Sequence, residues 1–179
     1  GYVGSAMQEI IPDLLLKFRE KHPDVVFNLK EMDNQKQIES LLSHDSDMGF
    51  VRLERIPKGL ETLPILKETF CLVLPKNHQI TNKEFISLSQ FKDESFILFD
   101  PKYSSSYYEK VMQIFDDSGF TPIITHNTIH ASSIYKLVEN NFGISIVPKS
   151  LIAQSNKHIK FIELRNIKQR TVLSVVWSK

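Results

Sequence analysis

Polar side chains that could hold a small anion recur where the sequence predicts helix starts. Ser5 stands three residues before Gln8, and Asn34 stands three residues before Gln37. At this spacing the side chains can satisfy the free backbone N–H groups of a first helical turn. A helix start also presents the positive end of the helix dipole, which favours a carboxylate. Each position is therefore open to two interpretations, helix capping or contact with an anionic ligand.

Two later segments show the same pattern. A polar loop at 100–105 precedes a predicted helix in which Ser106 and Glu109 form a capping pair, and Thr128 precedes the next predicted helix. None of these hydroxyls is a good nucleophile without a base beside it. Taken together, the helix starts predict that one small ligand is gripped from several sides, so that closure of two lobes could report its binding.

The sequence lacks the common signatures of catalysis and of metal binding. It contains no G-x-S-x-G, H-E-x-x-H, G-x-x-x-x-G-K or G-x-G-x-x-G motif. Its six histidines lack metal-ligand spacing, and residues 45–47 (DSD) lack the further ligands of a calcium loop. We therefore predict no catalytic residue, no metal and no cofactor.

Charge and cysteine content narrow the class of protein further. The 179 residues carry 22 basic and 21 acidic side chains, a net charge of +1, without the basic surface that duplex binding requires. No apolar run approaches the roughly 18 residues of a membrane span. The single cysteine, Cys71, lies in the apolar run 70–74, which predicts a buried, reduced thiol and a cytoplasmic location.

The elements that position these residues alternate along the chain. Apolar residues spaced three and four apart predict a helix from Met7 to about Lys21, with Ser5 at its start. Further helices are predicted to open at Asn34, Thr81 and Ser106 and after Thr128. The predicted strands are 25–32, 48–51, 96–99, 122–125, 144–147, 159–164 and 171–177. This alternation predicts an α/β fold with parallel sheets, in which ligands bind beyond the carboxyl ends of the strands.

Several motifs, in order, resemble the effector-binding domain of LysR-type transcriptional regulators. The opening of the chain contributes 11–18 (IPDLLLKF) and 22–25 (HPDV), and later matches are 47–52 (DMGFVR) and 72–78 (LVLPKNH). Residues 137–148 (LVENNFGISIVP) resemble the family pattern L-V-x-x-G-x-G-I-x-x-V-P, with Asn141 at its first glycine. Because asparagine tolerates the left-handed conformation of a helix C-cap, we expect this turn to be kept.

The resemblance covers essentially the whole chain and implies a type II periplasmic-binding-protein-like fold. In that fold two Rossmann-like lobes, 1–67 with 171–179 and 68–170, are joined by two crossing segments and hold an inducer in the cleft. The implied partners are a small organic anion and further copies of the chain, as a dimer or tetramer. DNA would be bound only through an N-terminal winged helix-turn-helix, which this sequence does not contain, and no membrane is involved. The implied effector-binding residues are Ser5, Asn34, Gln35, Pro101, Tyr103, Ser104, Thr128 and His130.

Our leading interpretation is thus a ligand-sensing domain of a bacterial transcription factor. The alternative is a solute-binding protein of a transport system, which shares the two-lobe architecture. An α/β enzyme is the third interpretation, and turnover that depends on His130 would support it.

Overall fold

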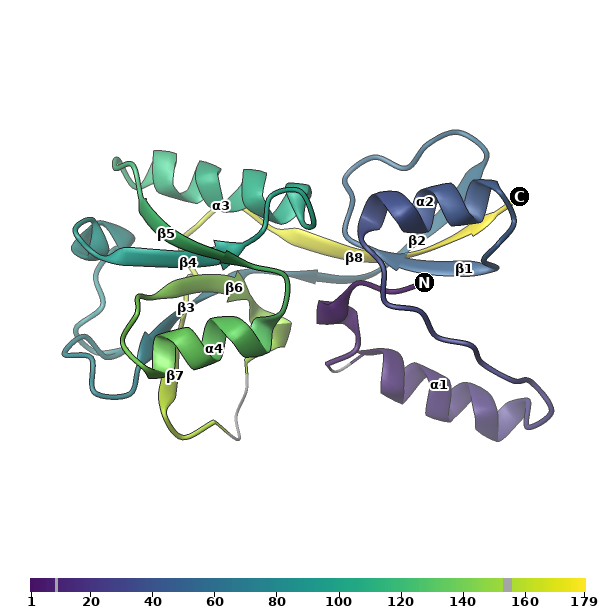
Figure 1. Cartoon of the computed structure of the whole chain (residues 1–179), viewed down its shortest axis with the longest axis horizontal. Helices are drawn as coiled ribbons and strands as arrows, with labels where there is room; N and C mark the ends of the chain where they lie inside the picture. Colours follow the sequence, from purple (N-terminus) through teal and green to yellow (C-terminus); the bar gives the residue numbers. More distant parts are fainter. Residues whose placement is uncertain (9, 153–155) are drawn as a thin grey trace. The chain divides into compact units, whose positions relative to one another are not determined.

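The computed structural model describes residues 1–8, 10–152 and 156–179, which form two compact units (Figure 1). Unit 1 comprises Gly1–Lys67 with Val172–Lys179, and unit 2 comprises Glu68–Thr171. Thr171, which the sequence analysis assigned to the first lobe, falls in unit 2. No helix in the described residues is long and apolar enough to cross a lipid bilayer.

Unit 1 is built on a three-stranded sheet in which β8 lies between β1 and β2. The helices α1 and α2 precede these strands in the chain (Figure 1). The elements are η1 (Gly4–Ala6), α1 (Ile10–Lys21), α2 (Asn34–Leu42), β1 (Met48–Val51), β2 (Leu60–Glu68) and β8 (Thr171–Ser178). Buried Leu41 of α2 forms one core cluster with Val51 of β1 and Val176 of β8, so apolar burial fixes α2 against the sheet.

Helix α1 begins later than the sequence predicted. A start directly after Ser5 was expected, but α1 starts at Ile10, and Ser5 lies in the short 3-10 turn η1. Pro12 explains the difference, because a proline lacks the backbone N–H and its ring clashes with the carbonyl four residues earlier. Proline is tolerated only in the first turn of a helix, and a start at Ile10 places Pro12 there.

Two other helix starts are shifted by one or two residues. The N-cap of α2 is Asp33, whose Oδ1 accepts a hydrogen bond from Lys36 N at 2.8 Å, so the prediction that Asn34 caps this helix is wrong. The capping pair predicted for Ser106 is also wrong, because α3 already begins at Ser105 with Ser104 as its N-cap. Where several capping residue types are adjacent, the pattern predicts that a helix starts but not at which residue.

Unit 2 contains a mixed set of strands with helices α3 and α4 flanking them (Figure 1). Strand β3 lies between β6 and β7 and pairs antiparallel with both, whereas β4 and β5 pair parallel. A parallel bridge between Phe96 and Ile144 joins β4 to the segment that leads into β6. The elements are β3 (Phe70–Pro75), η2 (Leu88–Phe91), β4 (Ser95–Phe99), α3 (Ser105–Asp117), β5 (Ile123–Thr128), α4 (Ala131–Glu139), β6 (Ser145–Pro148), η3 (Lys149–Leu151) and β7 (Ile159–Glu163).

The prediction of parallel sheets is therefore correct for β4 and β5, but the pairs β1–β8, β3–β6 and β3–β7 run antiparallel. Strand β1 pairs antiparallel with β8, and its parallel contact is a single bridge between Phe50 and Tyr2. Consecutive strands can pair in parallel only through a crossover connection, which is usually a helix. Neither β3 nor β8 directly follows a helix in the chain, so no such crossover sets the direction of these strands. Residues 25–30, predicted as a strand, form none, and only Glu31 bridges to Tyr2.

The short helix predicted after Thr81 is a turn. The carboxylate of Glu84 accepts a hydrogen bond from Thr81 N at 3.0 Å, as a capping pair would. Regular structure resumes only at η2, where Ser87 and Gln90 form a capping box. Together, this turn and η2 form one wall of a pocket in unit 2.

Cys71 lies fully buried in β3, which confirms the predicted buried thiol. Burial raises the pKa of this thiol from its ordinary value of 9.0 to about 12, with a smaller contribution from the carboxylate of Glu163. In the unfolded chain the thiol ionises above pH about 9, whereas in the fold it stays protonated until about pH 12. The thiol's contribution to the free energy of unfolding is therefore complete below pH 9 and declines between pH 9 and 12.

We expect Cys71 to resist iodoacetamide in the folded chain at pH about 8 and to react once denaturant unfolds unit 2, because the thiolate is the nucleophile. The difference in free energy of unfolding between the unsubstituted chain and Cys71→Ala should shrink between pH about 8 and 10. The reason is that the thiol ionises in the unfolded chain at these pH values but stays protonated in the folded chain. Urea unfolding at both pH values measures this difference. Rapid alkylation of the folded chain would contradict the assignment.

Candidate functional site

The carboxyl ends of β4 and β5 meet at one edge of unit 2 because the two strands run parallel. The Cα atoms of Phe99 and Thr128, the last residues of these strands, are partners. The loop after β4 is tied to β5 by a hydrogen bond from Asp100 N to Thr128 O at 2.8 Å. This edge therefore brings together five of the predicted site residues, Pro101, Tyr103, Ser104, Thr128 and His130.

Two helices begin at this edge, and the side chain of neither N-cap residue caps the first turn. Ser104 is the N-cap of the 13-residue helix α3, and His130 is the N-cap of the 9-residue helix α4. Within residues 104–139, all of which are described, neither N-cap side chain accepts a capping hydrogen bond. Free N–H groups and two positive dipole ends are the requirements of an anion site. By contrast, the start of α2 is closed by Asp33.

Asp100 shapes the loop that leads into α3. Its Oδ1 accepts hydrogen bonds from Lys102 N at 2.8 Å and from Tyr103 N at 3.2 Å. Its carbonyl oxygen accepts one from Ser104 N at 2.9 Å. An aspartate turn of this kind holds the backbone in place independently of any ligand. Asp100 was predicted to lie in this loop but not to be a functional residue; an aspartate directly after a buried strand is the signal that could have identified it.

The second strand end is ordered by a local contact. The Oγ1 of Thr128 donates a hydrogen bond to the carbonyl oxygen of His130 at 3.0 Å. Thr128 is half-buried and His130 is exposed, while Pro101, Tyr103 and Ser104 are half-buried. Ser104 and His130, both N-caps, thus lie at an accessible edge where a ligand could reach the first turns of both helices.

In unit 1, Arg52 joins two of the predicted residues. Its Nε donates a hydrogen bond to Ser5 Oγ at 2.9 Å. Asn34 Oδ1 accepts one from Arg52 N at 2.9 Å, and Asn34 Nδ2 donates one to Arg52 O at 3.2 Å. Arg52 and Asn34 are only 7% and 8% exposed. The structure therefore joins Ser5 and Asn34 to one buried arginine, Ser5 through its guanidinium and Asn34 through its backbone. Arg52 lies in a motif quoted above but was not predicted as a site residue.

Gln35 lies apart from this group. It is exposed, and its Nε2 donates a hydrogen bond to Glu39 Oε1 at 3.0 Å on the surface of α2. The neighbouring amide that is fully buried belongs to Gln37, which donates to the carbonyl oxygens of Met32 and Phe50. No group of three or more histidine, cysteine, aspartate or glutamate side chains in the described ranges could hold a metal ion.

Comparison with known proteins decides the family. The model of the LysR substrate binding domain matches residues 1–179. The chain belongs to the LysR substrate-binding domain family. This LysR domain is 28% identical over 180 residues to YnfL, an uncharacterized HTH-type transcriptional regulator of Escherichia coli (strain K12). The match covers 100% of this chain and 61% of YnfL, so the chain spans about three fifths of that relative.

Solved structures agree on the fold of this LysR domain. The BenM effector-binding domain with its effector benzoate superposes with a TM-score of 0.88 at 24% identity, covering 100% of this chain and 82% of that one. The QuiR effector-binding domain in complex with shikimate gives a TM-score of 0.85 at 20% identity, covering 100% and 85%. The type II periplasmic-binding-protein-like fold is thereby confirmed, and the family favours a ligand-sensing domain over a transport protein.

Proposed function

We propose that this LysR domain binds a small organic anion through the starts of α3 and α4 and so regulates transcription. The observation that carries the proposal is the pair of uncapped helix starts at the shared edge of β4 and β5. Two structures of the same fold hold carboxylate ligands, benzoate in BenM and shikimate in QuiR, which supports an anion of this class.

The predicted residues of unit 2 divide into two roles in this proposal. The Ser104 hydroxyl and the first N–H groups of α3 and α4 hold the carboxylate, with Thr128 and His130 beside them. Pro101 and Tyr103 cover the apolar body of the ligand. The unit 1 residues Ser5, Asn34 and Gln35, and the cleft between lobes 1–67 with 171–179 and 68–170, stay predictions.

For the whole protein we propose DNA binding through a separate winged helix-turn-helix domain, a cytoplasmic location and no enzymatic activity. The relatives named as HTH-type transcriptional regulators support this assignment. In such a regulator the effector acts through its different affinity for two conformations of the sensing domain. The near-neutral charge of this chain fits a sensing role, because it provides no basic surface for DNA.

The effector site is tested by placing a competing charge at the start of α3. Ser104→Asp should itself raise the stability of unit 2 by about 0.5 to 1 kcal/mol, because an aspartate at the N-cap satisfies free N–H groups. The same carboxylate should weaken binding of an anionic ligand about tenfold by occupying those groups and repelling the ligand. Titration with a panel of small carboxylates that includes benzoate and shikimate, followed by thermal unfolding, measures both effects.

Gln113→Glu is the matched control, since it adds the same charge to an exposed position in the middle of α3. It should leave ligand binding unchanged. The proposed function fails if no carboxylate in the panel raises Tm, or if the two variants weaken binding equally.

We also propose that the chain self-associates through the surface of residues 14–29 of unit 1. Half of the exposed large apolar side chains of the described residues lie in this segment. They are Leu14, Leu16, Phe18, Val25, Val26, Phe27 and Leu29. An apolar surface of this density on one segment is typical of an interface with another protein surface.

Val26→Lys should lower the mass of the chain in solution toward that of the monomer, because Val26 is 91% exposed and its replacement does not disturb a core. Analytical ultracentrifugation measures the mass. Leu63→Lys, at an exposed apolar position of β2 outside the segment, is the control and should not change it. A chain that is monomeric before any substitution would refute the proposed interface.

A further inference from the structure

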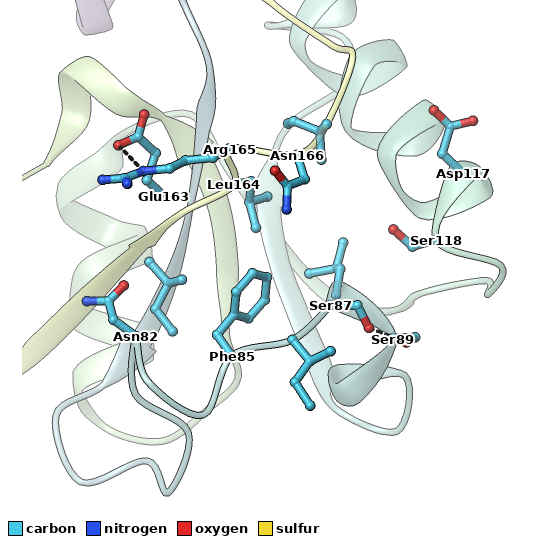
Figure 2. A pocket seen from close by; sticks show the side chains of 14 residues that line it. Asn82, Phe85, Ser87, Ser89, Asp117, Ser118, Glu163, Leu164, Arg165 and Asn166 are labelled. Carbon is cyan, nitrogen blue, oxygen red and sulfur yellow. Dashed lines mark hydrogen bonds and ion pairs between the residues drawn. The ribbon is translucent and has the colours of Figure 1, made fainter.

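Unit 2 contains a pocket that shares no residue with the proposed effector site. Its volume is about 670 Å³, within the range of small-molecule sites. Three segments form it: the turn and η2 at 82–89, the C-terminal end of α3 at 117–118, and β7 with its following loop at 162–167 (Figure 2). All three belong to the same compact unit.

The base of this pocket is apolar. Leu88, Ile162 and Leu164 line it and are 4%, 2% and 2% exposed. Phe85, also in the lining, is half-buried, and Ile86 at the rim is 83% exposed. The backbone of Ile86 is held in place, since its N–H donates to Gln90 Oε1 at 2.7 Å. The apolar surface is therefore presented by a fixed turn, and a ligand with an apolar body would cover it.

The α3 side of the pocket presents the carboxylate of Asp117 and the hydroxyl of Ser118. Asp116 and Asp117 end the helix, and its last turn contains no basic residue. Carboxylates at the negative end of a helix dipole are repelled by it, and a nearby cation stabilises them. Asp117 Oδ2 accepts a hydrogen bond from Gln169 Nε2 at 2.8 Å, while the buried Gln169 Oε1 has no partner among the described residues.

Two arginines near the pocket are engaged with other groups. Arg165 lies with Glu163 on the side away from Asp117 (Figure 2), with 3.5 Å between Arg165 Nε and Glu163 Oε2. Glu163 also pairs with Lys149 at 3.0 Å. Arg170 donates hydrogen bonds from Nη1 to the carbonyl oxygens of Ile167 and Gln169. Asp117 is the charged residue that α3 contributes to the pocket lining.

We propose that this pocket binds a small organic cation with an apolar body, an amine whose ammonium group lies at Asp117 and whose hydrocarbon part covers Ile86 and Leu164. The ammonium would donate to the carboxylate and to the C-terminal carbonyls of α3, for which a cation is the favourable partner. The proposal is independent of the proposed effector function, because the two sites have no residue in common.

The test uses 2-phenylethylamine as the probe, with 2-phenylethanol and 3-phenylpropionate as neutral and anionic probes of similar shape. Amide chemical shifts of the chain, recorded during titration, should show saturable binding of the amine, with shifts at Ser87, Ser118 and Leu164. The neutral and anionic probes should bind at least about tenfold more weakly. No saturation below about 10 mM amine, or equal binding of the three probes, would overturn the proposal.

Asp117→Asn should weaken amine binding about tenfold, because it removes the charge and keeps the acceptor for Gln169. Asp116→Asn removes the same charge from an exposed residue outside the lining and should weaken binding less than about threefold. Equal effects of the two variants would overturn the assigned position. Amine binding should persist in Ser104→Asp, so failure at the effector site and failure at this pocket are distinguishable.

Discussion

Gly143→Ala should lower the free energy of unfolding of unit 2 by about 3 kcal/mol, a large effect for one added methyl group. Gly143 has a φ of +153°, a backbone conformation that residues with a side chain rarely adopt. A Cβ at this position would lie 2.6 Å from the backbone oxygen of Ser95. That same oxygen accepts the hydrogen bond from Ile144 N at 2.8 Å, so neither group can move away without breaking the link between β4 and β6.

Hydrogen exchange of the Ile97 amide, which donates to Ile144 O at 2.8 Å, measures this loss. Gly119→Ala is the matched control. Gly119 also has a positive φ, +79°, but a Cβ there would meet nothing within 4 Å. It should cost only about 1 kcal/mol of backbone strain. Equal losses in the two variants would show that the contact with Ser95 is unimportant.

Asn34→Ala should destabilise unit 1 by about 2 to 4 kcal/mol, because it leaves a buried N–H and a buried C=O of Arg52 without their partners. Urea unfolding followed by the fluorescence of Trp177 measures this change. Trp177 is the single tryptophan of the chain, and it lies in β8 of the same unit, paired with Met48.

The control is Gln35→Ala, one residue further along α2. Gln35 is exposed, and among the described residues its side chain bonds to Glu39 in its own helix, so the substitution should change stability by less than about 0.5 kcal/mol. The comparison also separates two roles of the predicted site residues. If Asn34→Ala leaves stability unchanged, the amide does not support Arg52, and the buried position of this arginine must have another cause.

Sequence patterns predicted which segments form helices but not the residue at which each helix begins. The spacing of Ile10, Leu14 and Phe18 predicted α1, but the start after Ser5 was wrong because Pro12 restricts where the helix can begin. The proline was visible in the sequence, so this error could have been avoided. The choice of Asp33 over Asn34 as the N-cap of α2 could not, because both residue types cap well and the buried carbonyl and N–H of Arg52 retain Asn34.

Strand direction was less accessible to sequence than strand position. The apolar runs predicted β1, β4, β6, β7 and β8 close to where they lie. Their alternation with helices indicated parallel sheets, whereas β3 pairs antiparallel with both of its neighbours. A buried run of apolar residues has the same pattern in a parallel and in an antiparallel strand. The direction of a strand relative to its neighbours is therefore set by its pairing partners, which come from distant parts of the chain.

The family, the α/β class and the polar loops could be predicted from the amino-acid sequence, because they depend on residue types and on spacings that are local in the chain. Which of the loops meet depends on how the chain packs. The parallel pairing of β4 and β5 brings the loops that carry Ser104 and His130 to one sheet edge. Arg52 bonds to both Ser5 and Asn34, which lie 47 and 18 residues away in the chain. Hydrogen bonds and burial over such separations depend on the packed fold, and no local pattern records them.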